Sequence, residues 1–367
     1  MNQEKRHVNG STGDGRFSVY VARLVSIALL CLTLTLQNAC QPVPHSPDVI
    51  SAQTTAAPPV TAQPSIPNID ADADGIVDSL EEEIINRYAP LVKLHPDEQY
   101  LPADITWFLT MVKMSFDVRL GIDPQILQPH AVTSTNLLCQ TNGGQVSGLC
   151  ASPTNFFLEQ TDASGKDSLD TYRKQTRTGN ERNDWVCYAH VRFAPGKYQG
   201  TYDIQYIFFY AYNGDMAWGP VESAHEADFE HITVRLDADL KTILGIYYSA
   251  HDGEGKWYSQ PSSPDVKDGY SITADGHPIV FSGLDSHASY PWSGQWKRSG
   301  KPDDFTKDGG LEWDCRTKVV NLGEKAFPRE GMEWLQYSGR WGEIGQFSWT
   351  CGPYGPAYQD WWNADPD

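Results

Sequence analysis

A series of short β-branched and aromatic runs in the second half of the chain constrains the fold more than any other feature. These runs are separated by Gly, Asp and Pro, and they read "DIQYIFFYAYNG", "DFEHITVRLD", "KTILGIYYSAHDG", "GKWYSQ" and "HPIVFSG". Short strands separated by turn residues are typical of packed antiparallel sheets. The sequence therefore predicts a mainly β fold, a β-sandwich over residues 91–367, with long loop insertions such as the polar region 139–184.

The N-terminal residues have the pattern of an export signal. Basic residues precede an uncharged, largely apolar run at 24–36, whose thirteen residues are fewer than the ~20 that cross a bilayer. We therefore predict a signal peptide at 1–39. Ala39 before Cys40 fits a lipoprotein cleavage site, so we expect Cys40 to carry a lipid anchor to a membrane. Cleavage nearby without lipidation is the alternative, and the protein would then be secreted.

The segment after the predicted cleavage site has the composition of a tether. Residues 41–68 contain seven prolines and neither Lys nor Arg. Such a segment buries too little apolar surface to fold. We predict a disordered tether at 40–68, followed by a folded part that begins at Ile69.

Charge and missing motifs exclude several classes of function. The formal net charge of −19 at pH 7 repels duplex nucleic acid, so no nucleic-acid partner is expected. The chain has no Gly-x-Ser-x-Gly nucleophile turn, no phosphate-binding glycine loop followed by Lys-Ser/Thr, and no Cys-x-x-Cys pair. Hydrolysis through a side-chain nucleophile therefore has no support in the sequence.

Five cysteines fall in the folded part, so they cannot all pair. Cys139 and Cys150 flank a Gly/Asn-rich turn and are the best candidates for a disulfide. Cys315 with Cys351 is a weaker candidate pair, which leaves Cys187 over. The alternative is that all five are buried thiols, although exported chains usually oxidise their cysteines.

The stretch "DADADGIVDSLE", residues 70–81, fills every position of an EF-hand calcium loop. The oxygen ligands for Ca²⁺ would come from Asp70, Asp72, Asp74, the carbonyl of Ile76, Asp78 and Glu81. Gly75 stands where the loop turns sharply, and helical periodicity follows up to Pro90. Only the tether precedes the loop, so residues 69–90 are expected to form a structural calcium clamp plus one helix. The alternative is an acid-rich helix start capped by Ser79 and Glu82.

The stretch "ESAHEADFEHITVRLD" places many ligand-type side chains at the start of a predicted strand. Alternation puts Asp228 and Glu230 on one face with Ile232, Val234 and Leu236. Unpaired carboxylates beside a core would cost several kcal/mol each, so they lie at an open sheet end or are neutralised. His225 can reach the same end, which predicts a second site for Mg²⁺, Mn²⁺ or Ca²⁺. The alternative is a solvated strand end.

Three histidines are candidates for a general base if the second metal activates water. They are His231 on the same strand, His251 at the end of the next strand, and His287 in "LDSHASYP". Each alone is more often a hydrogen-bonded histidine of a loop or strand.

Most of residues 87–362 resemble the vacuolar protein sorting-associated protein 62 family, which has no known function. The similar pieces, in order, are "RYAPLVKLHPDEQYLPADITWFL", "DFEHITVRLD", "GIYYSAHDGEGKWY", "PIVFSGLDSHASYP" and "GRWGEIGQFSWTCGPYGPAYQDWW". The family's usual acid-Trp-Glu-His reads Asp228-Phe229-Glu230-His231 here.

A shorter stretch is similar to the necrosis-inducing cytolysins, which are β-sandwich toxins with a metal-binding His-x-x-Asp-x-Glu pattern. His225, Asp228 and Glu230 reproduce that spacing. The similarity implies that Asp215, at the end of the preceding strand, is a further metal ligand. This chain has Ala224-His225-Glu226-Ala227 in place of the toxins' Gly-His-Arg-His, which argues against membrane attack.

Three classes of function follow from these observations. The first is an exported, metal-binding β-sandwich that engages a lipid headgroup or a glycan at a cell surface. The second is a metal-dependent hydrolase of phosphoesters or glycans. The third is a structural envelope or adhesion module that uses exposed tryptophans.

Overall fold

A six-stranded sheet forms the centre of the computed structural model, which describes residues 69–117, 125–137, 155–161, 177–214, 224–263, 266–344 and 350–365. The sheet order is β15-β5-β6-β7-β8-β9, and only β15 and β5 are parallel. The strands are β15 (Val319–Asn321), β5 (Cys187–Phe193), β6 (Tyr202–Asn213), β7 (His225–Leu236), β8 (Ile243–Tyr248) and β9 (Lys256–Tyr258).

The long strands β6 and β7 pair from Tyr202 opposite Leu236 to Asn213 opposite His225. Nearly all their residues are buried, because both faces of the sheet are covered. Alternation along β6 sends Tyr206 and Phe208 into one core and Ile207 and Phe209 into another. The central sheet is therefore shared by two hydrophobic cores.

One face is covered by a four-stranded sheet and by the first described helix. The sheet order is β11-β10-β1-β14. Tyr88 and Val92 from this layer pack with Trp313 against the central sheet. The elements are α2 (Asp78–Tyr88), β1 (Leu91–Lys93), β10 (Ile279–Ser282), β11 (Ser289–Tyr290) and β14 (Glu312–Asp314).

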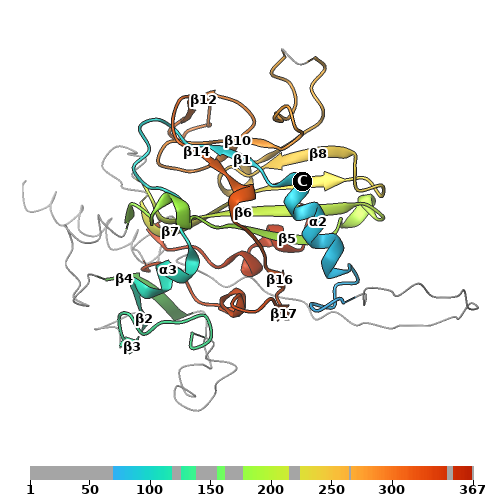
Figure 1. Cartoon of the computed structure of the whole chain (residues 1–367). Helices are drawn as coiled ribbons and strands as arrows, with labels where there is room; N and C mark the ends of the chain where they lie inside the picture. The colour runs from blue at the N-terminus through green and yellow to red at the C-terminus, as the bar shows by residue number, and fades with distance from the viewer. Residues whose placement is uncertain are drawn as a thin grey trace, which may run out of the picture.

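The other face is covered by a three-stranded sheet, β3-β2-β4, and by short helices. Its core contains Phe108, Trp334, Trp341 and Trp362. In Figure 1 the two covering sheets lie on opposite sides of the long strands β6 and β7. The elements are α3 (Ile105–Thr110), β2 (Val112–Phe116), β3 (Gln125–Leu127), β4 (Phe156–Gln160), η5 (Glu333–Gln336), η7 (Pro356–Tyr358) and η8 (Asp360–Trp362).

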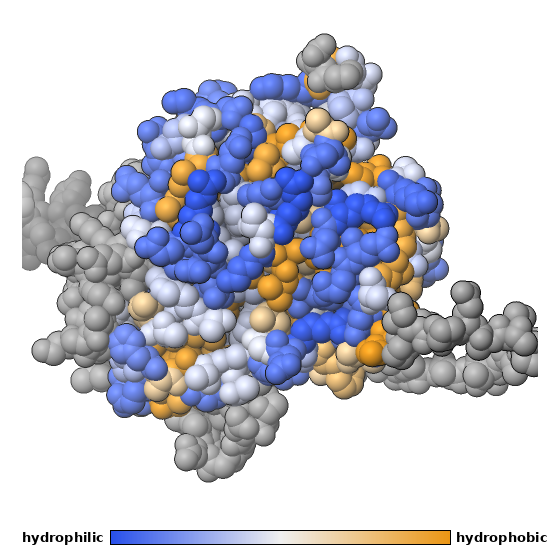
Figure 2. All heavy atoms as spheres, in the orientation of Figure 1, coloured by the Kyte–Doolittle hydropathy of each residue, from blue (hydrophilic) through white to orange (hydrophobic). Residues whose placement is uncertain are grey.

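The remaining described elements are hairpins and short helices at the edges of these layers. They are η2 (Arg182–Asp184), η3 (Gly196–Tyr198), α5 (His251–Glu254), β12 (Gly294–Trp296), β13 (Asp304–Thr306), η4 (Cys315–Thr317), β16 (Gly323–Glu324) and β17 (Phe327–Pro328). Hydrophilic residues predominate on the face shown in Figure 2, with hydrophobic residues in scattered patches. Across the described ranges, no helix is both long and apolar enough to cross a membrane.

The predicted β-sandwich class is confirmed, with one correction to the predicted insertion. Residues 156–160, which lie within the predicted loop region 139–184, form the fully buried strand β4. The sequence does not predict this strand, because its five residues are too few to stand out from the polar segment around them. The predicted signal peptide and tether, Cys40, and the pair Cys139 and Cys150 lie outside the described residues.

The expected bridge between Cys315 and Cys351 is wrong. Cys315 is a buried free thiol, as is Cys187, whereas Cys351 is disulfide-bonded. Cys315 packs in the core beneath α2, while the segment after Cys351 pairs with Trp341 in the opposite core. The central sheet separates the two cysteines. Cys187 is unpaired, as predicted.

Candidate functional site

The loop before α2 closes on itself through backbone hydrogen bonds to its own carboxylates. The N–H of Ala71 donates to Asp78 at 2.9 Å, and the N–H of Gly75 donates to Asp70 at 3.1 Å. Gly75 has φ +91°, a left-handed conformation that the sharp turn requires. Helix α2 begins after Val77, and no side chain caps it, so the alternative of a Ser79 and Glu82 capping box is wrong.

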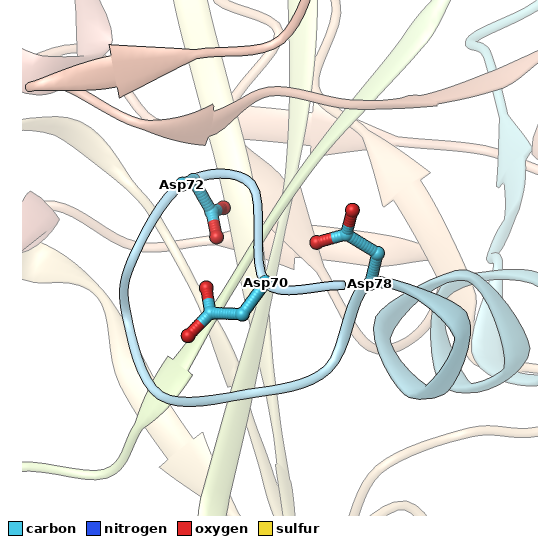
Figure 3. Close-up of side chains that lie close together, drawn as sticks. All are labelled: Asp70, Asp72 and Asp78. Carbon is cyan, nitrogen blue, oxygen red and sulfur yellow. The ribbon is translucent and has the colours of Figure 1, made fainter. Parts of the chain in front are cut away.

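Two overlapping groups of carboxylates meet inside this loop. Asp70, Asp72 and Asp78 form one group, and Asp72, Asp74 and Glu81 form the other. In each group, one oxygen per residue lies within 4.8 Å of the others. Figure 3 shows the carboxylates of Asp70 and Asp72 turned into the loop and that of Asp78 directed toward them from the start of α2. The negative charges of these carboxylates repel one another. Asp72 and Glu81 are only 2% and 0% exposed, so water screens that repulsion poorly.

Three buried carboxylate oxygens in this cluster have no hydrogen-bond partner among the described residues. They are Oδ1 of Asp72, Oδ2 of Asp74 and Oε1 of Glu81. Burial, together with the neighbouring carboxylates, raises the pKa of Asp74 to about 6 and that of Glu81 to about 8. An unsatisfied buried carboxylate oxygen is costly unless a cation binds it. The donor set consists only of oxygens, which suits Ca²⁺.

Arg329, directly after β17, supplies one positive charge to the cluster. Its guanidinium donates to Asp78 at 2.9 Å and to Glu81, and it lies 3.5 Å from Asp72. Asn321 at the end of β15 donates to Glu81 at 3.2 Å. One guanidinium cannot neutralise five acidic side chains. The loop therefore keeps an excess of negative charge where its unpartnered oxygens meet.

The strand β7 places Asp228 and Glu230 on the face that the alternation predicted. Asp228 accepts hydrogen bonds from Nδ2 of Asn213 at 3.1 Å and from Nδ1 of His287 at 3.0 Å. His287 stacks on Tyr210, which belongs to the same core as Ile232. The carboxylate of Asp228 is thus engaged by protein groups.

His287 is a buried imidazolium between two acids. Its Nε2 donates to the carbonyl of Tyr100 at 3.1 Å and lies 3.7 Å from Glu98, opposite the bond to Asp228. Burial lowers its pKa, but the carboxylates of Glu98 and Asp228 outweigh burial and raise the pKa to about 10. His287 is therefore protonated at neutral pH, which prevents it from acting there as a general base.

Glu230 lies beside Asp228 and His287, and burial shifts its pKa. Burial raises its pKa well above the usual range, and the charge of Asp228 adds to the effect. Oγ of Ser249 lies 2.5 Å from Oε2 of Glu230 and also accepts from the N–H of His231. Burial therefore favours the neutral form of Glu230, which is held next to the carboxylate that pairs with His287.

His251 and Asp304 form another histidine–acid pair near Glu230. Oδ2 of Asp304 contacts Nε2 of His251 at 2.7 Å and the hydroxyl of Tyr290 at 2.5 Å. Burial raises the pKa of Asp304, but the hydrogen bonds from His251, Tyr290 and Ser286 outweigh it and leave the pKa below its usual range. Non-glycine residues with positive φ gather in this region, namely Ala227, His251, Asp285 and His287. Such strain is common at functional sites.

The predicted ligand His225 and the predicted base His231 have partners other than the carboxylates of Asp228 and Glu230. Nδ1 of His225 donates to the carbonyl of Ala227 at 2.8 Å. His231 lies on the opposite face of β7, where it stacks on Trp361, and burial lowers its pKa to about 3. Asp215 lies outside the described residues. Within the described part of the chain, the groups close enough to hold a metal ion both lie in the calcium loop.

The sequence prediction missed three residues that complete these sites. Arg329 enters the calcium loop from 248 positions beyond Glu81. Glu98 faces His287, and Asp304 holds His251. Their sequence neighbourhoods carry no motif, so only the spatial arrangement reveals them.

A family model for vacuolar protein sorting-associated protein 62 matches residues 156–349, which is more than half of the chain. The chain belongs to the vacuolar protein sorting-associated protein 62 family. It is 27% identical to vacuolar protein sorting-associated protein 62 of Saccharomyces cerevisiae, with 75% of this chain and 67% of that protein covered. It is 24% identical to the putative vacuolar protein sorting-associated protein TDA6 of the same yeast, with 75% and 66% covered. The chain thus spans about two thirds of the length of these relatives.

Solved structures of toxins have weaker similarity to this family member. One described as a toxin fold for microbial attack and plant defense is 15% identical with a TM-score of 0.35, covering 80% of this chain and 95% of that one. NLPPya in complex with glucosamine is 13% identical with a TM-score of 0.31, covering 74% and 82%. TM-scores of this size do not establish a common fold.

Proposed function

We propose that this chain is an exported, calcium-binding β-sandwich protein that engages a polar ligand, a lipid headgroup or a glycan, at a cell surface. In this proposal the segment 1–39 is a signal peptide and Cys40 carries the lipid anchor. Ca²⁺ binds the loop 70–81 and fastens it to the sandwich. The apolar run and the Ala39-Cys40 junction support export.

The calcium proposal rests on the unpartnered oxygens of Asp72, Asp74 and Glu81. Each is buried, and all three belong to one group of converging carboxylates. Natural proteins pair nearly all buried polar atoms, so three orphans in one cluster indicate a ligand. Asp70, Asp78 and the carbonyl of Ile76 would complete the oxygen set.

The bound ion would act as a structural clamp. Glu81 lies in α2, and its neighbours Asn321 and Arg329 belong to β15 and to the segment after β17. Ile76 anchors the loop from below, since its side chain is buried in the core beneath α2. An ion bound by Asp72, Asp74 and Glu81 would therefore help to hold the loop and α2 against β15 and the segment after β17.

Thermal unfolding with Ca²⁺ and with a chelator tests this proposal. Ca²⁺ should raise the melting temperature of the parent protein and leave that of Asp74→Asn close to its value in chelator. Asp97→Asn is the matched control, because Asp97 is 73% exposed and outside the loop. An equal response of the parent and Asp74→Asn would refute the loop as the binding site.

A second candidate function is hydrolysis, favoured by the different surroundings of two neighbouring acids: burial favours the neutral form of Glu230, while Asp228 pairs with the imidazolium of His287. Two carboxyl groups in different environments are the arrangement that many hydrolases use. The predicted second metal site of Asp215, His225, Asp228 and Glu230 would serve this function and stays a prediction. Metal binding there requires His287 to release Asp228, so loss of a second metal equivalent in Asp228→Asn would be the supporting result.

A further inference from the structure

A cavity of about 470 Å³ lies between β8, β9, β11 and the segment that follows β12. It shares no residue with the calcium loop or with the Asp228 and Glu230 pair. Its walls combine aromatic rings with cationic side chains. Ligand sites are typically concave, with an aromatic lining and a few convergent polar groups.

The charge of this cavity opposes that of the whole protein. Four cationic residues line it, Lys256, Lys297, Arg298 and Lys301, against the single acid Glu254. The chain as a whole has a formal net charge of −19. A local excess of positive charge on so acidic a protein attracts a small anionic group into the cavity.

Glu254 shows how a carboxylate fits between these cations. It accepts from Nε of Arg298 at 2.6 Å and from Nζ of Lys301 at 2.8 Å. The hydrogen bond from Arg298 is the main reason that the pKa of Glu254 is lowered to about 2. Lys297 has no carboxylate partner among the described residues, so it is available to a second carboxylate. Lys256 lies 5.3 Å from the centroid of the Tyr258 ring and forms no ion pair with any residue that the structure describes, so it is available too.

The aromatic wall and the floor supply the rest of a binding site. Trp296 stacks on Tyr290 with ring centroids 4.3 Å apart and an interplanar angle of 17°. The hydroxyl of Tyr290 is fixed by Asp304. Ser289 on the floor is 1% exposed, and its Oγ has no hydrogen-bond partner in the part of the chain that the structure describes. A buried hydroxyl without a partner, in the wall of a cavity, indicates a polar ligand group.

We propose that this cavity binds a negatively charged sugar unit, a uronate residue of a polysaccharide. Its carboxylate would pair with Lys297 and Lys256, its ring would lie against Trp296, and a hydroxyl would bond to Ser289. A concave aromatic site fits a ring better than it fits free phosphate. This inference gives a site and a ligand class to the surface ligand proposed above, and it is independent of calcium.

Calorimetry with trigalacturonate and with the neutral trisaccharide maltotriose tests the inference. The parent should bind trigalacturonate at least tenfold more tightly than maltotriose, with an affinity that falls as salt is raised. Lys297→Gln should weaken binding about tenfold, as the loss of a charge-assisted hydrogen bond does. Ser289→Ala should also weaken binding, because it removes the hydroxyl on the floor of the cavity. A change of Trp296 fluorescence should accompany binding.

Lys241→Gln is the matched control, since Lys241 is exposed in the turn between β7 and β8, away from the cavity. It should bind as the parent does, and all variants should unfold at the parent's temperature. No binding of trigalacturonate by the folded parent, or equal binding of both trisaccharides, would overturn the inference. Binding only to phosphatidylinositol phosphate vesicles would also overturn it. Titrations in excess chelator separate this result from a failure of the calcium proposal.

Discussion

Two clusters of acids in this protein have the same kind of side chain but differ in how their carboxyl oxygens are hydrogen-bonded within the protein. In the calcium loop, Asp72, Asp74 and Glu81 each keep an oxygen with no partner. In the second cluster, Asp228 is held by Asn213 and His287, and Glu230 lies against Ser249. Within the described residues, the first cluster has one guanidinium for five acids, whereas the second pairs its acids with an imidazolium and a hydroxyl.

The difference shows that residue type alone does not identify a metal site. Carboxylates beside a core must be neutralised, and a protein can do this with an imidazolium, with a proton or with a bound ion. His287 supplies the imidazolium for Asp228, and the raised pKa of Glu230 supplies the proton. Arg329 neutralises the loop only in part, which is the reason that we propose a bound ion there.

Removal of His287 should have the largest effect on stability. His287→Ala leaves Glu98 and Asp228 as uncompensated buried charges, which costs about 3–5 kcal/mol. Denaturant unfolding should show this loss equally with Ca²⁺ and with chelator. His130→Ala is the control, because His130 is exposed and also has positive φ, so the backbone strain of alanine is matched. If Ca²⁺ reversed this loss of stability, the two acid clusters would not be independent of each other.

Substitution of Glu81 should remove the calcium response. With a dissociation constant of roughly 10⁻⁴–10⁻³ M, 10 mM Ca²⁺ stabilises the parent by about 1.4–2.7 kcal/mol. Glu81→Gln should lose that gain, yet in chelator at pH 7 it should be about as stable as the parent, because Glu81, with its pKa raised to about 8, is already mostly protonated there. A variant that is equally weakened in both conditions would show Glu81 to be a packing residue.

The pH dependence of stability should differ between calcium and chelator. The native loop binds protons more tightly than the unfolded chain, since the pKa of Glu81 is raised from 4.5 to about 8. In chelator, the loop's contribution to stability should therefore fall as the pH rises through this range. Saturating Ca²⁺ keeps these carboxylates ionised and should remove that slope.

His287 adds a pH dependence that calcium does not change. Its pKa is raised from 6.5 to about 10, so its contribution to stability is complete below 6.5 and is lost as the pH rises through 10. The difference between the calcium and chelator curves isolates the loop. Parallel curves would indicate that the loop acids do not titrate as proposed.

Substitution of Glu230 should have the smallest effect. Glu230→Gln replaces a neutral acid with a neutral amide of the same shape, so stability at pH 7 should change by less than about 1 kcal/mol. Asp228→Asn should cost more, because it removes the carboxylate that pairs with the imidazolium of His287. Thermal unfolding of the two variants compares them directly, and a larger loss in Glu230→Gln would show that Glu230 is ionised.

The sequence predicts the features that depend on neighbouring residues. Loop spacing at residues 70–81 predicts converging carboxylates, and alternation in β7 predicts the shared face of Asp228 and Glu230; the structure has both. The sequence cannot predict Arg329 in the loop or Glu98 beside His287, because each arrives through the topology of distant strands. The floor of the cavity at Ser289 depends on the same long-range packing.

A calcium titration of the parent, Glu81→Gln and Asp228→Asn tests the central claim most directly. Isothermal calorimetry should show one equivalent in the parent that is absent from Glu81→Gln and retained in Asp228→Asn. A second equivalent that only Asp228→Asn removes would establish the predicted second site without affecting the first. A parent protein that binds no calcium, or a Glu81→Gln variant that binds it with unchanged affinity, would contradict the account.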